Sequence, residues 1–264
     1  MLQLNNIYKT FNQGTINEKK AITNVSLQIN DGDFITVIGG NGAGKSTLLN
    51  LISGVYAIDS GSLILDKENI TSLSENKRAK YFGRVFQDPM MGTCADMEIQ
   101  ENLALAYRRG KRRTLKWSIT KPEKDFYKNQ LARLGLGLEN RLTDKVGLLS
   151  GGQRQALTLL MATLIQPKVL LLDEHTAALD PKTAAQVLKL TNEIASSEKL
   201  TTLMITHNMK DAIKYGNRLI MMHNGQIIYD VKGEDKQNLH VEDLLKKFEQ
   251  VAGGELSNDR MLLV

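Results

Sequence analysis

A glycine-rich stretch, residues 39–46, has the residue types that hold the phosphates of a nucleotide. It reads Gly-Gly-Asn-Gly-Ala-Gly-Lys-Ser and fits the pattern G-x-x-x-x-G-K-[ST]. Glycines let the backbone curl so that successive N–H groups point at an anion, while a lysine reaches the β- and γ-phosphates. A serine hydroxyl at this place is suited to ligate Mg2+. The candidate ATP contacts are therefore Gly39, Asn41, Gly42, Ala43, Gly44, Lys45, Ser46 and Thr47, with Lys45 also a catalytic candidate and Ser46 also a metal ligand.

Three further side chains could act on the same phosphates. Asp173 and Glu174 follow the apolar run 169–172, which predicts a buried strand that ends in two carboxylates. Asp173 is suited to hold Mg2+, and Glu174 to polarise the water that attacks the γ-phosphate. His207 follows a second apolar run and offers a donor to the developing charge. Taken alone, the acid after the strand could be a loop carboxylate and the histidine could be structural.

The elements around the loop are those that phosphate capture needs. Residues 34–38 are apolar and predict a buried strand, and residues 46–52 predict the first turns of a helix. A strand, a glycine-rich loop and a helix N-terminus place backbone N–H groups and the positive end of the helix dipole on one anion. The sequence therefore predicts that the chain binds a nucleoside triphosphate.

A second motif, residues 149–153, reads Leu-Ser-Gly-Gly-Gln and resembles the signature of ATP-binding cassette (ABC) ATPases. The other motifs of that family follow in the order that the family has. These motifs are Gln87 as the Q-loop, residues 169–174 as the Walker B strand, Asp180 in the D-loop and His207 as the switch histidine. The resemblance spans residues 2–230. The resemblance implies that Gln87 ligates Mg2+ and senses the γ-phosphate.

Ser150 stands at a predicted helix start, with glycines that expose backbone N–H groups, and so predicts a second anion site. In the ABC family this second site comes from a partner, because two copies face head to tail around two ATP molecules. The resemblance thus implies that Ser150, Gly151, Gly152 and Gln153 complete the phosphate site of another copy, with Asp180 along the seam. A monomer is then expected to bind ATP but hydrolyse it poorly.

The predicted fold is α/β, a P-loop NTPase core with a mainly parallel sheet. Residues 2–7 and 25–29 alternate apolar and polar side chains and predict antiparallel strands of an N-terminal β subdomain. In the connection between them, the resemblance implies an aromatic that stacks on adenine. Phe11 is the candidate and Tyr8 the alternative, unless the ring simply packs in the fold. The strand pattern disappears over about 88–150, which predicts an inserted helical subdomain. We expect one ABC ATPase domain over 1–264, with a C-terminal helix and tail over about 233–264.

Composition bounds the setting of this domain. No apolar stretch approaches the roughly 20 residues of a membrane-spanning helix, and the N-terminus lacks a secretion-signal pattern. Cys94 is the single cysteine, so no internal disulfide is expected. The net charge is +5, with a basic run at 108–113. A solvated loop is the first interpretation of that run. A contact with lipid headgroups is the second and binding of nucleic acid is the last.

One position departs from the family pattern in a way that concerns the site. His175 follows Glu174 where a proline is usual, which predicts a looser turn toward the D-loop. The phrases around it, residues 173–180 and 206–212, are similar to those of ATPases of bacterial uptake systems for aromatic or branched amino acids.

These features predict the ATPase subunit of an ABC importer of a small solute such as an amino acid. The alternatives are a stand-alone export ATPase and a soluble ABC ATPase acting on ribosomes or nucleic acid. ATP and Mg2+ are the expected cofactors, and the expected partners are a second ATPase subunit, permease subunits and a solute-binding protein, with no nucleic acid. The expected location is the cytoplasmic face of the membrane. Met90, Met91 and Met97 are the candidate surface for a permease helix, unless they fill the core of the helical region.

Overall fold

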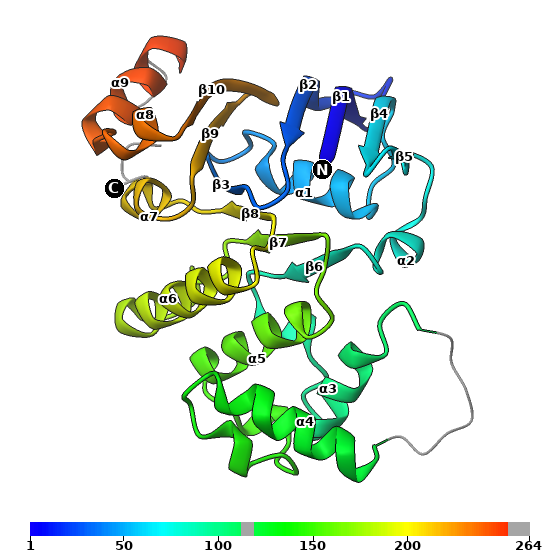
Figure 1. Cartoon of the computed structure of the whole chain (residues 1–264). Coiled ribbons are helices and arrows are strands. Elements are labelled where there is room, and N and C mark those ends of the chain that lie inside the picture. The colour runs from blue at the N-terminus through cyan, green and yellow to red at the C-terminus, as the bar shows by residue number, and fades with distance from the viewer. Residues whose placement is uncertain (112–118, 253–264) are drawn as a thin grey trace. The chain divides into compact units, whose positions relative to one another are not determined.

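The computed structural model describes residues 1–111 and 119–252. The chain forms two compact units, one built from residues 1–78 and 201–252 and the other from residues 79–200 (Figure 1). Each unit has its own strands, helices and apolar core, and each positions a separate part of the predicted site.

The first unit begins with an antiparallel sheet in the strand order β2-β1-β4-β5. Its strands are β1 (Leu2–Phe11), β2 (Lys19–Ile29), β4 (Ser60–Leu65) and β5 (Glu68–Asn69). Leu2, Leu4 and Ile7 are buried while the polar residues between them are more exposed, which is the pattern of a sheet with one covered face. The antiparallel prediction is confirmed, but β1 runs further than expected and includes the residues that were placed in the connection.

The second set of strands in the first unit has the order β10-β9-β3-β8. β3 (Phe34–Ile38) is parallel to both β8 (Thr202–Ile205) and β9 (Arg218–His223), and β10 (Gln226–Lys232) closes an antiparallel hairpin with β9. Every residue of β3 is buried, as its continuous apolar sequence predicts. The helices of this unit are α1 (Lys45–Ser53), α2 (Glu75–Arg78), α7 (Met209–Lys214), α8 (Glu234–Gln237) and α9 (Val241–Ala252).

The second unit pairs β6 (Phe82–Val85) in parallel with β7 (Val169–Asp173). As expected, the described chain between these two strands is helical rather than extended. It contains α3 (Ile99–Tyr107), α4 (Lys121–Ala132) and α5 (Gly151–Thr163), which pack around one apolar cluster, and α6 (Pro181–Ser197) follows β7. Within the two described ranges, no helix has the length and apolar character needed to cross a bilayer.

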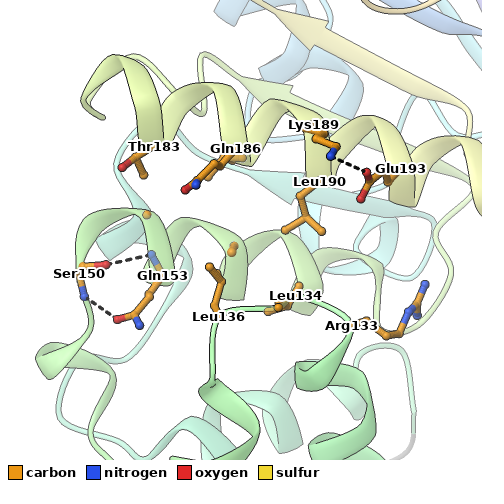
Figure 2. A pocket seen from close by; sticks show the side chains of 14 residues that line it. Arg133, Leu134, Leu136, Ser150, Gln153, Thr183, Gln186, Lys189, Leu190 and Glu193 are labelled. Atoms are coloured by element: carbon orange, nitrogen blue, oxygen red, sulfur yellow. Dashed lines mark hydrogen bonds and ion pairs between the residues drawn. The ribbon is translucent and has the colours of Figure 1, made fainter.

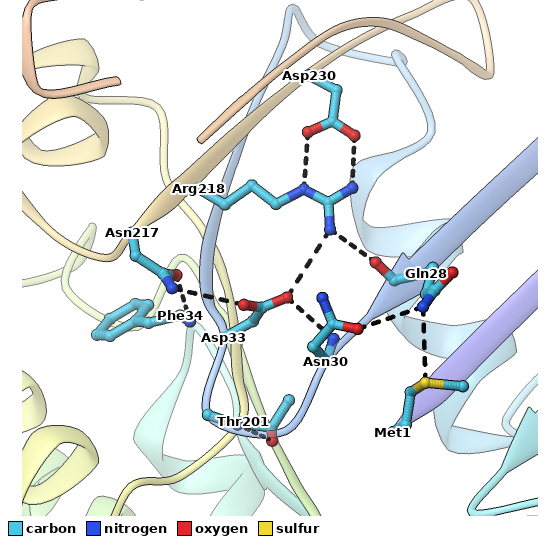
Figure 3. Close-up of polar contacts among 10 residues, drawn as sticks. Met1, Gln28, Asn30, Asp33, Phe34, Thr201, Asn217, Arg218 and Asp230 are labelled. Carbon is cyan, nitrogen blue, oxygen red and sulfur yellow. Dashed lines mark hydrogen bonds and ion pairs between the residues drawn. The ribbon is translucent and has the colours of Figure 1, made fainter. Parts of the chain in front are cut away.

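A charged network fastens the start of β3 to the neighbouring strands of the first unit (Figure 3). Arg218 on β9 donates from Nε to Asp230 at 2.7 Å and from Nη1 to the carbonyl of Gln28 at 2.6 Å, and lies 3.8 Å from Asp33. Hydrogen bonding to Asp230 raises the pKa of Arg218 above its usual range. Asp33, the residue just before the strand that leads into the phosphate loop, is therefore paired with an arginine side chain that is only 12% exposed.

We expect Arg218→Met to lower the free energy of unfolding by about 2 kcal/mol, because it leaves two carboxylates and a carbonyl without their shared cation. Urea denaturation would measure this loss. The matched control is Arg133→Met, whose ion pair with Glu198 has an arginine side chain that is 47% exposed. An exposed pair is worth less than about 1 kcal/mol, so equal losses in the two variants would contradict the proposed role of the network.

Candidate functional site

The phosphate loop has a backbone that only glycine fits at two places. Gly39 has φ +152°, and a Cβ there would lie 2.2 Å from the carbonyl oxygen of Met222. Gly44 has φ +100°, and a Cβ there would lie 2.6 Å from the carbonyl oxygen of Ala21. The loop between them is thus a backbone cradle without side-chain bulk, which suits the close approach of phosphate oxygens.

Lys45 closes this cradle and starts α1, one residue earlier than predicted. Its side chain is buried, and Nζ donates to the carbonyls of Gly39 at 2.7 Å and Gly40 at 3.1 Å. The ammonium therefore lies over the loop that the phosphates would enter. Ser46 and Thr47 follow in the first turn of α1, with Ser46 exposed. A hydroxyl at a helix N-terminus beside a buried ammonium fits the chemistry of a nucleotide phosphate and its cation.

The β9–β10 hairpin holds the loop in place and was not predicted from the sequence. The N–H of Gly225 donates to the carbonyl of Ala43 at 3.0 Å, and the carbonyl of Gly225 accepts from Thr23 at 2.9 Å. The hairpin turn is far from the loop in the sequence, so the motif alone contains no sign of it. The Asn-Gly pair at 224–225 does predict a tight turn, but not where that turn packs.

Phe11, the predicted adenine-stacking residue, is the last residue of β1. Its ring packs edge-on against Tyr56 with centroids 5.1 Å apart, and it pairs across the sheet with Lys19. The Nζ of Lys19 lies 3.5 Å from the place of a Cβ on Gly42, so the strand beside Phe11 reaches the phosphate loop. Tyr8, the alternative, is 38% exposed and pairs with the other neighbouring strand. This register favours Phe11, and it adds Lys19, a cation near the phosphate loop that belongs to none of the sequence motifs.

His207 lies at the same edge of the sheet as the phosphate loop. It follows β8, which pairs in parallel with β3, and the N–H of Thr206 donates to the carbonyl of Val37 at 3.2 Å. Asn208 then caps α7 by accepting from the N–H of Asp211 at 3.0 Å. The first unit therefore brings together the phosphate loop and His207 at the carboxyl ends of neighbouring strands.

The second unit places the predicted acids and Gln87 at one sheet edge. β6 and β7 are parallel and in register from Phe82 and Val169 onward. Asp173 is the last residue of β7 and Gln87 lies two residues after β6, so both are at the carboxyl ends of neighbouring strands. Asp173 is half-buried, with its carboxylate 3.6 Å from Nη2 of Arg84. Glu174 has φ +48°, a left-handed conformation that is uncommon for a residue with a side chain.

His175, which takes the place of the usual proline, is buried and hydrogen-bonded to a helix. The ring is 2% exposed, and Nε2 lies 3.0 Å from Oγ1 of Thr191 on α6. Burial lowers the pKa of His175 to about 4, so the ring is neutral near pH 7. The looser turn stays a prediction, and the structure adds that the His175 ring is hydrogen-bonded to a helix.

The signature residues form the start of α5, as predicted. Ser150 is the N-cap, with Oγ accepting from the N–H of Gln153 at 3.3 Å, and Gln153 accepts in return from the N–H of Ser150 at 3.2 Å (Figure 2). Gly151 is exposed and Gly152 is buried. A Cβ on Gly152 would lie 2.2 Å from the methyl group of Thr183, so its absence lets α5 and α6 approach closely.

Asp180 caps α6 by accepting from the N–H of Thr183 at 3.1 Å, and these bonds from Thr183 lower the pKa of Asp180. Beside the two capped helix starts lies a cavity of about 330 Å³. Ser150 and Gln153 face Thr183 and Gln186 across it (Figure 2). The two expected contributors to a shared seam, the signature and Asp180, thus lie close together within the second unit.

The described part of the basic run is held by the second unit itself. Arg108 pairs with Glu123 at 2.9 Å, and Arg109 donates to the carbonyls of Ala162 and Ile165 at 3.0 and 2.6 Å, near the end of α5. Lys111 lies 3.6 Å from the ring centroid of Tyr107. These contacts differ from those of a purely solvated loop. The remaining residues of the run, 112 and 113, lie outside the described residues.

Comparisons with known proteins agree with these motifs. A family model described as "ABC transporter" matches residues 22–177. The chain is 49% identical to a tyrosine transport ATP-binding protein of Clostridioides difficile, over 94% of this chain and 99% of that one. It is 33% identical to a spermidine/putrescine import ATP-binding protein of Haemophilus influenzae, over 91% of this chain but only 61% of that protein's length. Its fold matches a dimeric ATP-binding cassette bound to ADP and Pi, at 27% identity and a TM-score of 0.75, over 88% of this chain and 98% of that one.

Proposed function

This chain belongs to the ABC transporter family as one of its ATP-binding, ATP-hydrolysing subunits, and from that premise we propose that it powers the uptake of an amino acid. It does so at the cytoplasmic face of a membrane, where separate permease subunits carry the solute. Tyrosine is the first candidate solute. The single observation that carries this proposal is the 49% identity, over nearly the full length of both chains, to a tyrosine transport ATP-binding protein.

We assign the chemistry to the residues at the two sheet edges. The loop 39–47 binds the phosphates, with Lys45 at the β- and γ-phosphates, and Phe11 stacks on adenine. Ser46, Gln87 and Asp173 offer a hydroxyl, an amide and a carboxylate oxygen, the hard ligands that Mg2+ prefers, and would hold this ion. The bound Mg2+ would neutralise charge on the phosphates. Glu174 takes a proton from the attacking water, and His207 donates to the γ-phosphate as charge develops.

The signature residues act on a second copy of the chain. Ser150 is exposed, yet its helix start presents backbone N–H groups with a positive dipole end, so it is suited to an anion that the other copy binds. The dimeric form of the matched cassette structure supports this arrangement. A homodimer of this kind closes on ATP and reopens after hydrolysis, which is the motion that drives the permease.

Reconstitution of the chain with its permease subunits and a solute-binding protein in proteoliposomes tests the proposal. We expect ATP-dependent accumulation of labelled tyrosine on the same side of the bilayer as the ATPase. Accumulation of spermidine instead would replace the proposed solute, and ATP-dependent loss of solute in the other direction would show the export alternative. Copurification with ribosomes or DNA and no membrane protein would contradict the transporter role altogether.

The permease is expected to dock beside the Q-loop, on exposed methionines of the second unit. Met90 is 44% exposed and Met91 is 70% exposed, so they do not fill the core of the helical region. Arg154 donates to the sulfur of Met90 and to the carbonyl of Gly147, and so connects the two segments. Leu148, the residue after Gly147, is 71% exposed. Flexible thioethers beside an exposed leucine suit an apolar partner helix. Met97 is only half-buried and lies further along the same segment.

We expect the double substitution Met90→Glu and Met91→Glu to release the permease subunits, because it places charge in an apolar contact. Copurification from detergent would measure the release, and calorimetry with ATP should show unchanged binding. The control is Ile16→Glu, which adds one charge of the same sign to a fully exposed apolar residue of the first unit. If the double variant kept its permease as the control does, the docking site would lie elsewhere.

A further inference from the structure

A buried hydrogen bond joins the residue after Glu174 to the middle of α6. The hydroxyl of Thr191 lies 2.8 Å from the carbonyl of Val187, one turn earlier in the same helix, and 3.0 Å from Nε2 of His175. A hydroxyl has one proton, and the carbonyl can only accept, so Thr191 donates to Val187. It therefore accepts from His175, whose Nε2 must carry the proton.

This bond acts on a strained piece of backbone. Glu174 has φ +48°, and for a residue with a Cβ this region is costly unless its surroundings impose it. On the downstream side, the N–H of Ala177 donates to the carbonyl of Glu174 at 3.0 Å and closes a turn. On the upstream side, Glu174 continues directly from the buried strand β7. His175, the second residue of that turn, is anchored by its ring to α6.

The bond also satisfies the buried imidazole of His175, a polar group that is not needed merely to fill space. A buried imidazole loses its water and is favourable only with its N–H bonded, whereas an apolar residue of similar size would fill the space without a partner. Both Thr191 and His175 are almost completely buried, at 0% and 2% exposure. Burying this polar pair beside Glu174 costs free energy that an apolar pair would not cost. We take this cost to indicate that the site needs a hydrogen bond of fixed orientation and not only a filled space.

We infer that His175 and Thr191 are positioning residues, which hold the Glu174 carboxylate at the angle needed to take a proton from the attacking water. This inference rests on the proposed role of Glu174. It also ties the turn that carries Glu174 to α6, the helix that Asp180 caps.

Thr191→Val tests the link, because valine keeps the shape of threonine and removes the acceptor. We expect the turnover number for ATP to fall by on the order of ten- to a hundredfold, the scale of a slightly misplaced catalytic group. The KM for ATP should stay within about twofold, since the phosphate loop is untouched. Thr191→Ser keeps the hydroxyl and should restore most of the turnover. The matched control is Thr163→Val, a buried threonine whose hydroxyl makes the same backbone bond one turn back, to Leu159 at 3.0 Å.

A double-mutant cycle with Glu174→Gln separates positioning from a general structural role. If His175 and Thr191 act through Glu174, Thr191→Val should lower the residual turnover of the Glu174→Gln protein by less than about twofold. A fall of equal factor in both backgrounds would overturn the inference, as would a loss no greater than that of Thr163→Val. If Glu174→Gln itself kept near-normal turnover, the assigned role of Glu174 would fail first and the inference with it. ATP affinity measured by calorimetry would identify any variant that is merely unfolded.

Discussion

Glu174→Gln should retain ATP affinity and lose roughly two or more orders of magnitude in turnover, the usual scale for a lost general base. Glutamine has the shape of glutamate and keeps a carbonyl oxygen, but its amide does not take up a proton. Glu174 lies directly after β7 in the second unit, whereas Lys45 and the phosphate loop belong to the first unit. The substitution therefore changes the chemistry and leaves the phosphate cradle as it is.

Single-turnover kinetics and calorimetry together test this expectation. Calorimetry should give a dissociation constant for ATP close to that of the wild type, and light scattering should show an ATP-bound dimer that persists because hydrolysis no longer opens it. Glu193→Gln is the control, since that carboxylate lies on α6 with a side chain 59% exposed and pairs only loosely with Lys189. Turnover of Glu174→Gln within a few-fold of the wild type would mean that another group activates the water.

The ABC ATPase fold could be predicted from the sequence because its strands and loops have strong local patterns. β3 has the predicted bounds. Its short apolar run ends at a glycine loop and has no helical periodicity that would favour another assignment. The predicted adenine contact was placed in a connection, but Phe11 belongs to β1. That extension depends on pairing with Lys19 and Lys20 on β2, and such cross-strand pairing does not appear in the local pattern.

The supports of the site were less predictable than the residues of its motifs. Gly225 holds Ala43 from a hairpin far along the chain, and Thr191 holds His175 from the middle of a helix. Neither partner belongs to a motif, because a hydrogen bond to a backbone carbonyl or a single hydroxyl places few demands on the sequence around it. His175 shows the same limit in reverse. The missing proline was visible in the sequence, but the bond from His175 to Thr191 was not.

The second large effect concerns dimer closure. Substitutions of Lys45 and Ser150 should affect two different steps, ATP binding and ATP-driven dimerisation. Lys45→Ala removes the buried ammonium over the phosphate loop and should weaken ATP binding by roughly tenfold or more, the scale of a lost charge-assisted hydrogen bond. Ser150→Arg should leave ATP binding to the monomer nearly intact, because Ser150 lies in the other unit. It should nevertheless abolish ATP-driven dimerisation, since a long cationic side chain would occupy the space of the partner copy's γ-phosphate.

Light scattering with ATP in the Glu174→Gln background measures dimer formation for both variants. Ser150→Arg also removes a helix cap, which costs about 1 kcal/mol by itself. Thr120→Arg is the matched control, because Thr120 is exposed and starts α4 with the same reciprocal capping arrangement, in its case with Glu123. The control loses a cap and gains the same charge outside the signature, so it should dimerise normally. If Ser150→Arg also dimerised normally, the signature would not complete the site of a second copy, and hydrolysis would have to be completed within a single chain.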